Sequence, residues 1–95
     1  MNKVRRVVVL SGDSFGVLAL KLVAPVTTFT AAKAGKMWLV PVNPSAANGL
    51  ETESVVDALQ VRGLSTKRFK RRVGRLSDED MVEVTTAVAL VIEYE

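Results

Sequence analysis

The sequence contains no cysteine and no histidine, and each absence removes a class of chemistry. Without cysteine, the chain can form neither a disulfide framework nor a thiolate zinc site. Without histidine, it lacks the commonest general base. Arginine, lysine, threonine and serine remain as candidate functional groups. These side chains suit the binding of a phosphate group and the stabilisation of a phosphorane-like transition state.

Long apolar runs are missing as well. The opening MNKVRRVVVL begins with basic residues, but its apolar part is too short for a signal peptide. No segment reaches the roughly 18 uncharged apolar residues that a membrane-spanning helix needs. We therefore expect a cytoplasmic protein that makes no membrane contact. The 95 residues suit one domain, residues 1–95, and no internal repeat divides them.

Positive charge is concentrated in the first four fifths of the chain. Residues 1–76 hold all 13 lysines and arginines and only four acids, a net charge of +9, whereas residues 77–95 hold six acids and no base. The densest stretch, KRFKRRVGR, carries Lys67, Arg68, Lys70, Arg71, Arg72 and Arg75. A basic body of this kind suits a polyanion such as nucleic acid, or an acidic segment of a partner protein.

The acidic block after this stretch has a local structural explanation. Ser77 stands in the N-cap position of a predicted helix, and the three acids at 78–80 lie at the positive end of its dipole. The apolar residues Met81, Val84, Val88 and Val91 then recur at helical spacing. The remaining grouped carboxylates, Glu51, Glu53 and Asp57, are expected to be solvated.

Five segments are predicted as strands: 4–10, 18–27, 37–42, 54–62 with a possible bulge, and the basic segment 69–76. The β-branched run Val4–Leu10 predicts a strand buried on both faces. Pro25 lacks a ladder donor, so it should lie at an edge or a bulge. The loops are expected at 11–16, 28–36 and 43–50. The pattern predicts an α+β fold, in which a small, twisted, mostly antiparallel sheet or half-open barrel is closed by the C-terminal helix.

Two pairs of residues at strand ends are candidates for phosphate chemistry. Arg5 and Arg6 open the first predicted strand, and strand alternation points one of them toward the interior side of the sheet, where a guanidinium needs a partner. The alternative is that both lie in solvent at a frayed strand start. Thr27 and Thr28 close the second strand, where threonine is ordinary.

Four stretches occur in an order that is typical of one protein family: VRRVVVLS, VAPVT, GLETESVVDALQVRGLSTKRFKRRVGRLSDEDMVEV and AVALVI. Together they resemble the MazF/PemK (Kid-like) toxins, which are metal-independent RNA endonucleases of toxin–antitoxin pairs. The resemblance runs from Val4 to Ile92. It implies a CcdB/Kid-like, SH3-like barrel, a homodimer and no cofactor. It also implies two competing partners: single-stranded RNA and the acidic segment of a cognate antitoxin.

The resemblance also implies roles for individual residues. Arg5 corresponds to the catalytic arginine and Thr27 to the catalytic threonine. The residues that it implies for RNA binding are Arg6, Thr28, Lys33, Lys36, Gln60, Arg62, Lys67, Arg68 and Lys70. The chain departs from the family pattern at Arg6, where proline is usual, at Leu59, often aspartate, and at Gly63, usually threonine. It also begins almost at the arginine, without the extra strand with which family members usually open.

In the implied reaction, the RNA 2′-hydroxyl attacks the adjacent phosphorus and leaves a cyclic phosphate and a 5′-hydroxyl end. Three other functions remain open at this point. One is a CcdB-like poison of DNA gyrase, and another is a non-cleaving module that binds RNA or an antitoxin. The third is a basic barrel of a ribonucleoprotein.

Overall fold

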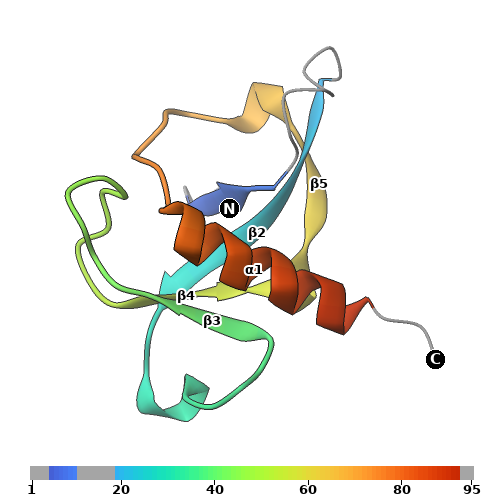
Figure 1. The fold of residues 1–95 in the computed structure, drawn as a ribbon. Coiled ribbons are helices and arrows are strands. Elements are labelled where there is room, and N and C mark those ends of the chain that lie inside the picture. The colour runs from blue at the N-terminus through green and yellow to red at the C-terminus, as the bar shows by residue number, and fades with distance from the viewer. Residues whose placement is uncertain (1–4, 11–18, 93–95) are drawn as a thin grey trace.

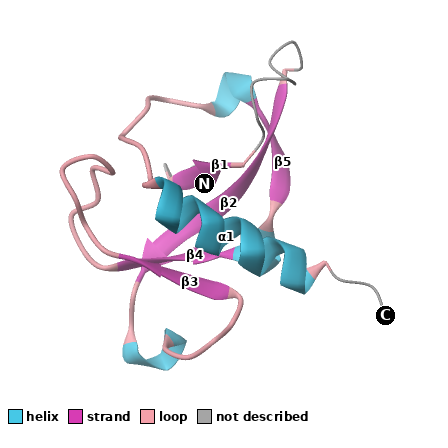
Figure 2. Cartoon of the chain, in the orientation of Figure 1, coloured by secondary structure: helices cyan, strands magenta, loops and turns pink. Residues whose placement is uncertain are grey.

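The structure is a computed structural model that describes residues 5–10 and 19–92. Its elements are arranged as a curved sheet with one α-helix lying across it (Figures 1 and 2). In chain order they are β1 (Val7–Val9), β2 (Leu20–Thr28), η2 (Ala31–Lys33), β3 (Leu39–Val42), β4 (Ser54–Asp57), η3 (Ala58–Gln60), β5 (Arg62–Ser65), η4 (Thr66–Arg68) and α1 (Asp78–Val91), where η denotes a 3-10 helix. The loop predicted at 11–16 lies outside the described residues.

Every strand pairing in the sheet is antiparallel, which confirms the predicted fold class. The strand order is β1-β2-β4-β3, and β5 pairs with β2 as well. β4 and β5 follow one another beside β2, because the long strand predicted at 54–62 is interrupted by η3. β2 is therefore the central strand, because it pairs with β1, β4 and β5.

Pro25 lies where the pairing of β2 with β5 ends and its pairing with β4 has not yet begun. This position suits a residue without a backbone N–H. Val23 of β2 pairs with Arg62 of β5, and Val26 pairs with Val56 of β4. Ala24 and Pro25 thus face the five residues 57–61 between these two pairings, where no ladder hydrogen bond is needed from proline. The expectation of an edge or bulge position is confirmed as a bulge, since β2 lies inside the sheet.

The prediction for the first strand was wrong in one respect. β1 covers only Val7–Val9, and it is not buried on both faces: Val8 is buried, whereas Val9 is 40% exposed. The reason is its place at the end of the strand order. Full burial on both sides falls instead on the inner strands, where the neighbours Val55 and Val56 of β4 are 1% and 0% exposed.

The basic segment 69–76 was also predicted wrongly, because it forms no strand. It runs as an irregular strap from η4 to the start of α1 (Figure 1). The strap is held by backbone contacts to the loop before β4: the Arg75 N–H donates to the Ala47 carbonyl at 2.8 Å. Gly74 lies so close to the Ala47 and Asn48 backbone that a Cβ at this position would overlap both residues.

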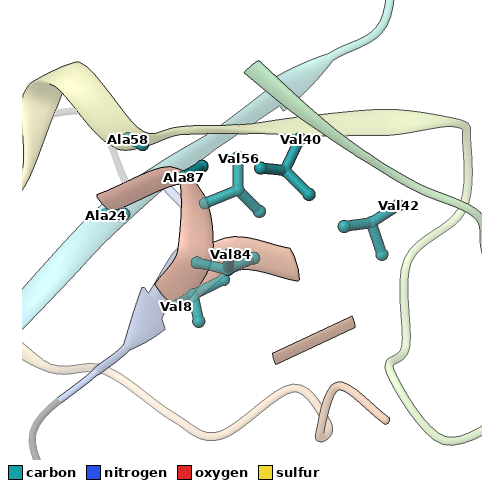
Figure 3. Packing of buried hydrophobic residues seen from close by; sticks show 8 residues of the cluster. All are labelled: Val8, Ala24, Val40, Val42, Val56, Ala58, Val84 and Ala87. Carbon is teal, nitrogen blue, oxygen red and sulfur yellow. The ribbon is translucent and has the colours of Figure 1, made fainter. Parts of the chain in front are cut away.

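The hydrophobic core lies between the sheet and α1. Ser77 caps the helix as predicted, since its Oγ accepts from the Asp80 N–H at 3.0 Å. Val84 and Ala87 are the buried helix residues, and Figure 3 shows sheet side chains grouped around Val84. Met81, Val88 and Val91 pack against the same cluster, which confirms the predicted apolar stripe. No helix in the described residues is both long and apolar enough to cross a membrane.

Candidate functional site

The register between β1 and β2 places Arg5 opposite Thr27. Val7 pairs with Pro25, and the ladder continues beyond β1, because the Val26 N–H donates to the Arg6 carbonyl at 3.0 Å. The next residues in the same register are Arg5 and Thr27. Directly opposite residues of an antiparallel pair share one face of the sheet, with Cβ atoms roughly 4.5–5.5 Å apart. A guanidinium and a hydroxyl are therefore presented side by side from neighbouring strands.

The two groups differ in how firmly they are held. Thr27 is half-buried and pairs on its other side with Val55 of β4, so the sheet fixes its backbone on both edges. Arg5 is exposed, and its side chain makes no hydrogen bond to another described residue. Its five donors can therefore turn toward a ligand that sits over Thr27. This arrangement suits an anionic group, such as a phosphate, bound at that end of the sheet.

Lys33 joins this pair from the loop that follows β2. Its Nζ atom donates to Thr27 Oγ1 at 3.2 Å and to the Thr28 carbonyl at 2.7 Å. The sequence predicted Lys33 as an RNA-binding residue but not this contact. The spacing of six residues carries no signal for it, because the contact depends on the turn formed by η2. The structure thus brings together Arg5, Thr27 and Lys33.

Three further predicted residues lie on the same strands in different relations to this group. By strand alternation, Arg6 and Thr28 point to the face opposite Arg5 and Thr27, and both are exposed. Arg62 pairs with Val23, on the face that carries Thr27. Val23 lies four residues before Thr27 on β2, so Arg62 is roughly 13 Å from Thr27 at 3.3 Å per residue.

Gln60 and Lys36 do not join the group through any contact in the described structure. Gln60 lies in η3, where its Nε2 atom donates to Asp57 Oδ2 at 2.7 Å. Asp57 in turn caps η3 by accepting from the Leu59 N–H, so both side chains are used locally. Lys36 is exposed in the turn after η2. The other two acids of the expected solvated set, Glu51 and Glu53, are exposed as predicted.

The densest cations lie far from Thr27. The Thr66 N–H at the start of η4 donates to the Ala19 carbonyl, just before β2 begins, whereas Thr27 lies near the end of β2. Thr27 is eight residues after Ala19 along the strand, a distance of roughly 26 Å. The predicted RNA-binding residues Lys67, Arg68 and Lys70 therefore lie toward the opposite end of the sheet and are exposed.

A pocket of about 480 Å³ lies elsewhere, between the loop at 43–50 and the start of α1. Its lining includes Asn43, Asn48, Arg75 and Asp78, and none of the residues predicted for catalysis or RNA binding. Asn48 has a structural role there: its Oδ1 accepts from the Ser45 and Leu50 N–H groups, and its Nδ2 donates to the Asn43 carbonyl. In the described residues, no group of three or more acids lies close enough to hold a metal ion.

The fold is similar to solved toxin structures. The Mycobacterium tuberculosis toxin MazF-mt6 superposes with a TM-score of 0.77 and 26% identity, over 95% of this chain and 89% of that one. A structure of an Mtb toxin gives a TM-score of 0.78 and 27% identity, over 93% and 92%. The MazE-MazF complex of Deinococcus radiodurans gives a TM-score of 0.75 and 24% identity, over 93% and 81%. Comparison with curated proteins gave no significant match.

The antiparallel sheet and the C-terminal helix across it define a small toxin-type domain. The sequence profile of the PemK-like, MazF-like toxins of type II toxin–antitoxin systems matches residues 1–92. The chain belongs to this family, and the resemblance seen in its sequence is confirmed.

Proposed function

We propose that this toxin is a metal-independent endoribonuclease that cleaves single-stranded RNA by transesterification. The observation that supports the proposal most directly is the register that sets Arg5 opposite Thr27 on one face of the sheet. In the reaction, the 2′-oxygen forms a bond to the adjacent phosphorus, and the bond from phosphorus to the 5′-oxygen breaks. The proton lost from the 2′-hydroxyl passes to solvent, and the leaving 5′-oxygen takes one up.

The chemistry required of the protein is positioning and charge stabilisation, because the nucleophile belongs to the substrate. The Arg5 guanidinium neutralises the charge that builds up on the phosphate oxygens. Thr27 donates its hydroxyl hydrogen to one of those oxygens. Removing a single donor of this kind lowers kcat by about 10²–10³-fold in enzymes that stabilise an oxyanion.

RNA binding beyond the reacting phosphate is assigned to the exposed cations. No ion pair joins the basic stretch to a carboxylate of the described residues, so these charges are available to a polyanion. Because they lie toward the other end of the sheet, one RNA strand would have to span several nucleotides to reach both places. An acidic antitoxin segment would compete for the same charges. A homodimer and an antitoxin partner are further parts of the proposal, in keeping with the MazE-MazF complex of the Deinococcus relative.

The test is incubation of the purified protein with a long RNA in EDTA, followed by mapping of the ends. We expect cyclic-phosphate and 5′-hydroxyl ends, and no cutting of DNA, which lacks the 2′-hydroxyl. Arg5→Ala and Thr27→Val should each abolish most cleavage. Lys21→Ala and Thr86→Val serve as matched controls for a lost charge and a lost hydroxyl away from the site.

Other outcomes, in this experiment or on expression of the protein in cells, would contradict the proposal. Full activity of both site variants would refute the assigned roles. RNA binding with a steep salt dependence but without products would select a non-cleaving binding protein. Growth arrest with failed DNA supercoiling and intact messenger RNA would select a gyrase poison.

A further inference from the structure

Lys33 has a bonding pattern that constrains the hydroxyl of Thr27. An ammonium has three N–H donors and no acceptor, so in the contact of 3.2 Å between Lys33 Nζ and Thr27 Oγ1 the threonine oxygen must accept. The hydroxyl hydrogen of Thr27 is then free to be donated elsewhere. It points away from the ammonium, because hydrogens of two donors repel. Lys33 thereby selects which of the hydroxyl rotamers Thr27 adopts.

The same ammonium keeps one donor for a ligand. Two of its N–H groups are used by Thr27 Oγ1 and the Thr28 carbonyl, both neutral oxygens. No carboxylate of the described residues pairs with it, although Lys33 is half-buried. An uncompensated positive charge thus stands next to Thr27, and it comes from η2 rather than from the strand segment that carries Arg5. An anion over Thr27 would be flanked by both cations.

We infer that Lys33 is a positioning residue for cleavage: its ammonium holds the Thr27 hydroxyl so that the hydroxyl donates to the scissile phosphate. This inference rests on the proposed nuclease function. It assigns Lys33 a role that differs from general attraction of RNA, since it acts through one side chain and on one step. Lys33 lies in η2, a turn whose backbone is closed by its own N–H bond to the Thr30 carbonyl. That turn fixes where the ammonium can reach.

A purely structural lysine would behave differently. The bond of 2.7 Å to the Thr28 carbonyl also closes the turn after β2, so loss of Lys33 could simply loosen that turn. Loosening would lower the unfolding temperature and would act whether or not Thr27 carries a hydroxyl. Positioning through Thr27 disappears when the hydroxyl is absent, and a double-mutant cycle measures this dependence.

The first experiment compares Lys33→Met, Thr27→Val and the double variant by steady-state cleavage of RNA in EDTA. We expect Lys33→Met to lower kcat by about 10–100-fold with KM changed less than about threefold, a pattern of transition-state loss. In the Thr27→Val background, Lys33→Met should have almost no further effect. Lys21→Met is the matched control, because Lys21 is half-buried like Lys33 but lies near the start of β2, far from Thr27. It should retain full activity.

The second experiment uses the absence of cysteine in the chain. Lys33→Cys carries the only thiol, so aminoethylation restores an ammonium at this site alone, whereas a neutral alkyl group of similar length restores only bulk. We expect activity to return with the aminoethyl group and not with the neutral group. Thermal unfolding of each form shows whether it is folded.

The outcomes separate the inference from the function on which it rests. A wild type that does not cut RNA would overturn both. A cutting wild type with an unchanged kcat in Lys33→Met would overturn the role of Lys33 alone. Effects of Lys33→Met and Thr27→Val that simply multiply would show that Lys33 acts independently of the hydroxyl. A changed KM at constant kcat would show that Lys33 contributes only to RNA binding and not to the positioning of the Thr27 hydroxyl.

Discussion

Two valines of α1 allow the packing of the helix on the sheet to be tested with one substitution. Val84 is fully buried at 0% exposure, and Val82, two residues earlier, is 63% exposed. Truncation of Val84 to alanine removes two carbons from the core, about 1.6 kcal/mol at about 0.8 per carbon. The cavity left among the sheet residues adds about 1 kcal/mol to this loss of stability, and the higher helix propensity of alanine offsets about 0.5 kcal/mol of it. The expected loss is therefore about 2 kcal/mol.

The same change at Val82 should be nearly silent. Only about a third of its surface is covered, so the lost burial is about 0.6 kcal/mol, which the gain in helix propensity offsets. Thermal unfolding followed by circular dichroism measures both variants. At about 4–8 °C per kcal/mol for a domain of this size, Val84→Ala should lower Tm by about 8–16 °C and Val82→Ala by no more than about 2 °C. Equal shifts would refute the assignment of the buried face of the helix.

Three further predictions concern the helix cap, the strap and the basic stretch. Ser77→Ala should destabilise the protein by about 1 kcal/mol, measured by urea unfolding, because it removes the acceptor for the Asp80 N–H. Gly74→Ala should cost about 1–3 kcal/mol in the same assay, since its Cβ overlaps loop backbone, whereas Gly63→Ala meets only a leucine side chain that can shift and should cost less. Replacing Lys67 and Lys70 by alanine should weaken binding of a 2′-O-methylated RNA and reduce the salt slope by about 1.4, if each contacts one phosphate; an unchanged slope would place the RNA elsewhere.

The elements that the sequence predicted well are those with a strong local pattern. The serine cap and the apolar spacing from Met81 to Val91 defined α1 almost to the residue, because helix formation depends on neighbours three and four positions apart. Pro25 marked the bulge for an equally local reason, its missing donor.

The predictions that failed needed information from distant residues. Cations and a few apolar residues at 69–76 could alternate as a strand, but no strand of the described residues pairs with them. The segment packs on the loop around Ala47 instead. The interruption by η3 was foreseen only as a bulge. Its extent depends on how β4 and β5 share the side of β2, which no local pattern encodes.

For the candidate site, the sequence by itself determined the inventory: no thiol, no imidazole, a concentration of positive charge, and an arginine and a threonine at two strand ends. Only the tertiary structure decided their geometry. The pairing register brought Arg5 opposite Thr27, and the η2 turn carried Lys33 to the same hydroxyl. The type of each residue can be seen in the sequence alone, but the register is set by burial and hydrogen bonding along whole strands. A slip of one position would send Arg5 to the other face of the sheet.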